Sequence, residues 1–136
     1  GFFASMLPVL LVLVATLPLR DPSKQHAFLQ LLRSDSRVET ILWITLAVTL
    51  FAPLTEELLF RVILQGSLQS RVQPAYAVAL SAIVFSAIHG WPDSLGLVPL
   101  ALILGYVFYR RNSYLAVVIL HALFNLTNLL MALSES

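Results

Sequence analysis

Five long apolar runs, separated by short polar segments, dominate this chain: residues 2–19, 38–70, 74–89, 94–109 and 114–133. A helix of about 20 apolar residues crosses a hydrocarbon core of about 30 Å and satisfies its own backbone hydrogen bonds. Only 11% of the 136 residues are charged and 59% are hydrophobic, whereas a soluble domain carries about twice that charged fraction. The sequence therefore predicts an all-α, polytopic transmembrane helix bundle with about five membrane helices.

The first run, residues 2–19, lacks the basic segment that begins a secretory signal, so we expect a true span there. Residues 20–37 carry charges of both signs around an apolar strip, which is typical of a loop with a short interfacial helix. The start on Gly1 suggests a segment of a longer chain. We predict one membrane-embedded domain over residues 1–136, whose orientation and oligomeric state the sequence leaves open.

The second run is too long for a straight perpendicular span. Its 33 residues would measure about 50 Å as a helix. A kink at Pro53, a tilt or a protrusion into water is therefore expected. The links at residues 90–93 and 110–113 are short, so neighbouring helices should be antiparallel.

Charge and cysteine content exclude several functions. A net charge of +1 offers no basic field for a nucleic-acid backbone, so no nucleic-acid partner is expected. The absence of cysteine excludes disulfides, thiolate metal ligands and a cysteine nucleophile.

Ionisable and amide side chains inside three of the apolar runs mark the candidate site: Glu56, Glu57, Arg61, His89, His121 and Asn125. Such groups are costly in lipid and usually face a bundle interior or a wet cavity. Measured from the side of Arg71 and Arg110, Glu56 lies about 21 Å deep and His89 about 22 Å. His121 lies about 12 Å deep and Asn125 about 18 Å. Antiparallel helices should therefore bring these groups together.

Spacing within each helix divides this set. Glu57 and Arg61 are four residues apart, which suits an ion pair, whereas Glu56 lies about 100° around the helix from Glu57. His121 and Asn125 are also four apart and share a face. On the third run we expect Phe85 to pack beside the imidazole of His89, and on the fourth we expect Gly105 to allow a close helix contact.

Three ordered sequence blocks resemble a known family. Glu56 to Arg61 resembles an EExxxR motif, Phe85 to His89 resembles FxxxH, and His121 to Asn125 resembles HxxxN. In this order on membrane helices, they resemble the CAAX prenyl endopeptidase and bacteriocin-processing family of intramembrane glutamic proteases, over core residues 53–128. The resemblance implies a peptide or lipidated-protein substrate, contact with membrane lipid, and hydrolysis without a cofactor.

The same resemblance implies a role for each residue. Glu56 would be the general base that activates water, and His89 would help bind and orient that water. His121 and Asn125 would stabilise the oxyanion, and losing one such donor typically costs about a hundredfold or more in rate. Glu57 and Arg61 would hold Glu56 in place.

Other interpretations stay open at this point. Glu56, His89 and His121 can supply three ligands to zinc, although nothing in their spacing requires a metal. Glu56 can also be a second partner of Arg61, the histidines can be interhelical hydrogen-bonding groups, and Asn125 can be a packing amide. A proton-coupled transporter also buries acids and histidines, and a catalytically inactive scaffold protein is a further alternative. Motifs of zinc, serine and aspartyl intramembrane proteases are absent from the sequence.

Overall fold

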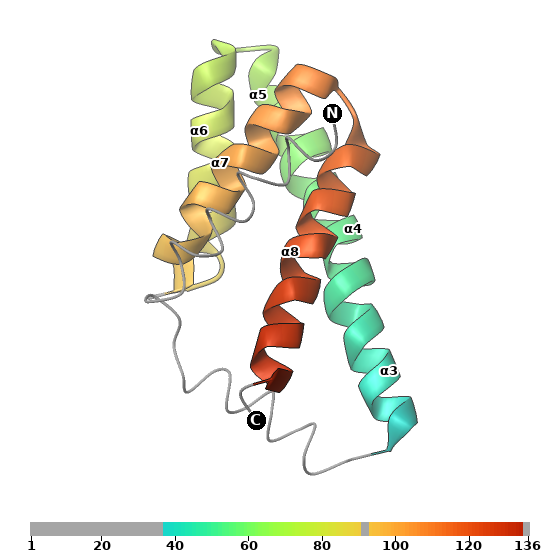
Figure 1. Cartoon of the computed structure of the whole chain (residues 1–136). Helices are drawn as coiled ribbons and strands as arrows, with labels where there is room; N and C mark the ends of the chain where they lie inside the picture. Colours follow the sequence, from blue (N-terminus) through green and yellow to red (C-terminus); the bar gives the residue numbers. More distant parts are fainter. Residues whose placement is uncertain (1–36, 91–92, 135–136) are drawn as a thin grey trace.

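The computed structural model describes residues 37–90 and 93–134, and all regular structure in this part of the chain is helical (Figure 1). One long helical rod consists of α3 (Val38–Leu46), the π-helical segment η2 (Ala47–Phe51), α4 (Ala52–Glu57), the π-helical segment η3 (Leu58–Gln65) and α5 (Gly66–Gln69). It is followed by α6 (Pro74–Ala87), α7 (Asp93–Arg111) and α8 (Tyr114–Ser134). The described residues thus confirm the all-α fold class.

Three of these rods are long and apolar enough to cross a membrane: Val38–Gln69, Ser94–Arg111 and Tyr114–Met131. The fourth, α6, ends at Ala87 rather than His89 and has 14 residues. It measures about 21 Å, less than a hydrocarbon core. The predicted span at 2–19 and the loop at 20–37 lie outside the described residues. The described part of the chain therefore has four helical rods, three of them of membrane-spanning length, and the expected total of five is not confirmed.

The long rod passes Pro53 without leaving the helical conformation. The turn before the proline is wide, because the N–H of Ala52 bonds the carbonyl of Ala47, five residues back. In the same pattern the carbonyl of Val48 would bond residue 53, but proline has no N–H. The side chain of Asn125 on α8 donates to this Val48 carbonyl over 2.9 Å. A neighbouring helix thus satisfies the backbone group that the proline frees, as membrane helices require.

The helices are packed antiparallel around two apolar clusters. In Figure 1 α7 lies beside α6, and α8 packs between α7 and the long rod. One cluster joins α7 to α8 through Leu100, Leu104, Phe108, Val117, Leu120 and Phe124. The other joins α6 to α7 through Ala82, Phe85 and Ala101, with Phe60 of the long rod packed against it. The second cluster lies directly beside the candidate site.

Gly105 allows the close contact that the sequence predicts. Its carbonyl accepts a 2.8 Å hydrogen bond from Nε2 of the buried Gln65. A Cβ at this position would lie 3.0 Å from Oε1 of Gln65 and 3.0 Å from a methyl carbon of Val78. A side chain here would therefore push α7 away from the long rod and from α6.

Candidate active site

The centre of the site is a buried ion pair on the long rod. Glu57 and Arg61 have no exposed side-chain surface, and Nε of Arg61 lies 3.0 Å from Oε2 of Glu57. This N–H is not aligned for a hydrogen bond, so the contact is chiefly electrostatic. Nη1 of Arg61 donates to Oγ of Ser81 on α6 over 3.3 Å, and that hydroxyl donates to the carbonyl of Phe60 over 2.8 Å. The predicted pairing of Glu57 with Arg61 is therefore present, and Ser81 ties it to α6.

Glu57 also holds the imidazole of His121. The Nδ1 atom of His121 lies 2.8 Å from Oε1 of Glu57, and only 4% of the histidine side chain is exposed. A carboxylate paired with arginine accepts hydrogen bonds, so Nδ1 of His121 carries a proton. Nε2 of the same ring is turned toward Glu56. One acid thus fixes both the orientation and the tautomer of this histidine.

Glu56 occupies a different environment from its neighbour. Its side chain is 26% exposed, and one oxygen, Oε2, lies 3.7 Å from Nε2 of His121 and 3.9 Å from Nε2 of His89. These separations are too long for direct hydrogen bonds. A single oxygen atom can still lie about 2.8 Å from both atoms of such a pair if it sits off the line joining them. Oε2 of Glu56 is therefore the atom that both imidazole Nε2 atoms approach.

His89 completes this group from just beyond the end of α6. Its Nδ1 lies 2.7 Å from the carbonyl of Phe85, which can only accept, so Nδ1 carries the proton and Nε2 faces Glu56. The side chain is 29% exposed. Two of the three converging groups, Glu56 and His89, are thus partly exposed, while His121 is buried.

Phe85 has a larger part in the site than the sequence indicates. Its fully buried ring lies 4.7 Å from the ring of His89 and 5.8 Å from that of His121, with the guanidinium carbon of Arg61 at 5.0 Å. The predicted packing against His89 is confirmed, and the same ring also contacts His121 and Arg61. Ser81, Phe85 and His89 follow at four-residue intervals, a shared-face signal that the sequence contained.

Asn125 does not join the converging groups directly. In the described part of the chain its side-chain hydrogen bond goes to the carbonyl of Val48. The amide still has a second N–H and a carbonyl oxygen. Its observed role is to connect α8 to the long rod, one turn of α8 away from His121.

The described residues contain no group of side chains arranged as metal ligands. Among residues 37–90 and 93–134, no group of three or more His, Cys, Asp or Glu side chains is arranged so that it can hold a metal ion. The three side chains named as candidate zinc ligands approach one another through a single carboxylate oxygen of Glu56.

Comparison with known proteins gives one family match. The model of a family described as type II CAAX prenyl endopeptidase Rce1-like matches residues 38–127. The chain belongs to this family. The match includes every residue of the candidate site and identifies the chain, in general terms, as a membrane-bound CAAX-type protease. No curated protein and no solved structure matches the chain.

Proposed function

We propose that this Rce1-like chain hydrolyses a peptide bond of a prenylated, membrane-associated CAAX-type substrate with a water activated by Glu56. The observation that carries the proposal is the approach of one Glu56 oxygen to two imidazole nitrogens, at 3.7 and 3.9 Å. General bases act on a proton within hydrogen-bond reach, directly or through one water. The family match supports a protease of this kind and a prenylated peptide as its substrate.

The two glutamates are assigned different roles because their surroundings differ. Glu57 is fully buried, with Oε1 hydrogen-bonded to His121 and Oε2 facing Nε of Arg61 at 3.0 Å, so both of its oxygens face other side chains. Glu56 is partly exposed and has no direct hydrogen bond from the histidines, so Oε2 is available to a water. We therefore assign the general base to Glu56 and the support of His121 to Glu57.

The reaction begins when a water donates one hydrogen to Oε2 of Glu56 and the other to Nε2 of His89. As Glu56 removes its proton, the water oxygen forms a bond to the carbonyl carbon of the substrate. The carbonyl oxygen becomes an oxyanion. The protonated Glu56 then gives the proton to the leaving nitrogen as the C–N bond breaks, which leaves a carboxylic acid and an amine.

His121 can stabilise the oxyanion only as an imidazolium. Its Nδ1–H is directed at Glu57, so Nε2 donates a hydrogen bond only when it is protonated as well. Glu57 lies 2.8 Å from Nδ1 of this ring, so a carboxylate is already in place beside an imidazolium.

Asn125 is assigned a second contribution to the oxyanion site. Its amide already donates to Val48, so the remaining N–H is the group that can reach a substrate oxygen. This assignment separates a structural hydrogen bond from a catalytic one on the same side chain, and the two can be tested apart.

The test of the proposed function is cleavage of a farnesylated CAAX peptide by purified protein in proteoliposomes. Glu56→Gln keeps the shape of the side chain but removes the base, and a general base typically contributes about 10²- to 10⁴-fold. We expect kcat to fall by at least about a hundredfold. The matched control is Glu39→Gln, an exposed acid at the start of α3, which should keep wild-type activity. Equal cleavage by wild type and Glu56→Gln would reject the assignment of the base. Absence of cleavage by wild type across prenylated and unprenylated peptides would favour the transport or scaffold alternatives.

A further inference from the structure

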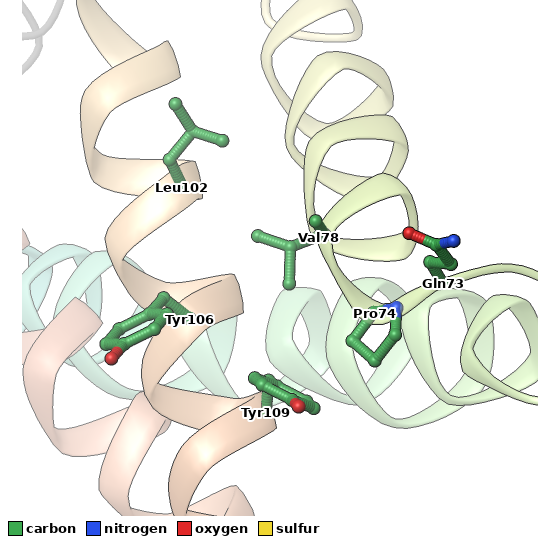
Figure 2. Close-up of a pocket in the computed structure, with 7 residues that line it drawn as sticks. Gln73, Pro74, Val78, Leu102, Tyr106 and Tyr109 are labelled. Carbon is green, nitrogen blue, oxygen red and sulfur yellow. The ribbon is translucent and has the colours of Figure 1, made fainter.

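A concave site lies at the other end of α6 from His89. A groove of about 640 Å³ between the start of α6 and the last turns of α7 is lined by Gln73, Pro74, Ala75, Val78, Leu102, Tyr106 and Tyr109. Figure 2 shows its two sides, with Pro74 and Val78 on α6 facing Leu102 and Tyr109 on α7. About 24 Å of helix separates Gln73 from His89, so the groove is not part of the candidate active site.

The lining is apolar with a polar margin. Its aliphatic members suit a hydrocarbon chain, and its volume lies within the range of about 300–1,000 Å³ common for small-molecule sites. Tyr106 and Tyr109 are 58% and 44% exposed. Tyrosines with an apolar ring and a wet hydroxyl are enriched at the level of lipid headgroups. The two tyrosines therefore favour a position of the groove near the membrane interface.

Three arginines cluster at this end of the bundle. Arg71 lies in the turn between α5 and α6, two residues before Gln73, and Arg110 and Arg111 directly follow Tyr109. The turn between α5 and α6 and the C-terminal end of α7 lie at the same end of the molecule (Figure 1). All three side chains are exposed, and none forms an ion pair within the described part of the chain. The open groove is thus flanked in sequence, next to both helices that line it, by exposed arginines without an ion pair to any described residue.

We propose that this groove binds one anionic phospholipid of the surrounding membrane. An acyl chain lies between α6 and α7, and the phosphate is held by the guanidinium groups of Arg71, Arg110 and Arg111. Guanidinium groups bind phosphate through paired, charge-assisted hydrogen bonds. Basic pockets between membrane helices recognise anionic headgroups by this charge complementarity. The inference is independent of the proposed proteolysis, because it uses none of the catalytic groups.

The arginines can instead serve only to stabilise the end of a helix, and that role predicts a different result. Arg110 and Arg111 occupy the last turn of α7, where cations stabilise a helix C-terminus. Arginines with that role alone would not select one lipid class and would not depend on the shape of the groove. Lipid selectivity combined with sensitivity to the groove therefore distinguishes a binding site from interfacial anchoring.

The experiment is native mass spectrometry of the detergent-purified chain, titrated with dioleoylphosphatidylglycerol or with dioleoylphosphatidylcholine at low ionic strength. A cation near the membrane surface contributes about fivefold in affinity for an anionic lipid. We expect one phosphatidylglycerol bound per chain, with at least about tenfold preference over phosphatidylcholine. The triple variant R71Q/R110Q/R111Q should abolish this preference. Each single variant should weaken it by about two- to fivefold, so the test does not depend on the folding of the triple variant.

The shape of the groove is tested by a matched pair of substitutions. Leu102→Trp fills the groove, whereas Leu115→Trp places the same ring on an exposed position of α8 outside it. We expect only Leu102→Trp to reduce phosphatidylglycerol retention, by at least about fivefold. Equal binding of the two lipids, unchanged preference in the arginine variants, or equal effects of the two tryptophans would each overturn the proposal.

Discussion

Glu57 accepts a 2.8 Å hydrogen bond from Nδ1 of His121, a residue on another helix and 64 positions later in the sequence. The same carboxylate faces Arg61 at 3.0 Å, so one buried acid connects the ion pair to the histidine. Its neighbour Glu56 faces the opposite nitrogen of that imidazole. The two adjacent acids thus have separate tasks, one holding the ring and the other facing the reactive position.

Removing the charge of Glu57 should destabilise the fold. Glu57→Gln leaves the guanidinium of Arg61 buried without its counterion, and breaking such a pair costs about 3–5 kcal/mol. We expect a large decrease in Tm in detergent, measured by thermal unfolding. The double variant Glu57→Gln/Arg61→Met should recover part of that loss, because no lone charge then remains. A double variant that is no more stable than Glu57→Gln would mean that the ion pair is not the main contribution.

The two histidines should respond differently to substitution. His89 is 29% exposed, so His89→Ala should leave Tm nearly unchanged while kcat for the prenylated peptide falls by about a hundredfold. His121 is buried and hydrogen-bonded to Glu57, so His121→Ala should lower both Tm and kcat. Cleavage assays and thermal unfolding of both variants check this contrast. Wild-type activity in His89→Ala would remove it from the mechanism.

The hydrogen bond from Asn125 to Val48 should contribute to stability because Pro53 leaves that carbonyl without a backbone donor. Asn125→Leu should cost about 1–3 kcal/mol, the penalty for leaving a partly buried carbonyl without a donor. Pro53→Ala supplies the missing N–H, so it should stabilise the Asn125→Leu background more than it stabilises wild type. A double-mutant cycle of unfolding free energies measures this coupling, and a coupling near zero would contradict the explanation.

The same double variant separates the two roles of Asn125. If the amide also stabilises the oxyanion, Asn125→Leu/Pro53→Ala should regain stability yet remain about a hundredfold less active. Recovery of activity together with Tm would show that Asn125 acts through structure alone. Peptide cleavage and thermal unfolding on the same preparations give both results.

Metal removal should leave the reaction intact under the proposed glutamate mechanism. We expect full cleavage activity after dialysis against EDTA and 1,10-phenanthroline, and less than stoichiometric zinc by elemental analysis of the purified protein. Loss of activity that added zinc restores, together with one zinc per chain, would establish the zinc-dependent alternative with Glu56, His89 and His121 as ligands.

The helix bounds were largely predictable because hydrophobic periodicity and chain punctuation are local. The helices predicted over residues 38–70 and 114–133 are observed over Val38–Gln69 and Tyr114–Ser134, within one residue at each end. The third helix was predicted two residues too long, since Ile88 and His89 form a turn after α6. Its predominantly apolar sequence continues to Ile88, so no local signal marked that end. The approach of Glu56, His89 and His121 to one another could also be predicted. Short links make neighbouring helices antiparallel, so the depth of each residue in the bundle can be estimated from its position in its helix.

The sequence by itself determined the membrane helices, the polar residues that must be buried among them, and the family to which their ordered motifs belong. Only the tertiary structure decided which partner each polar atom has. Four-residue spacing predicts that Glu57 meets Arg61, but it cannot show that His121 is the second partner or that Asn125 bonds Val48. Those contacts depend on the rotation of each helix about its axis, which packing between distant segments sets and local sequence does not.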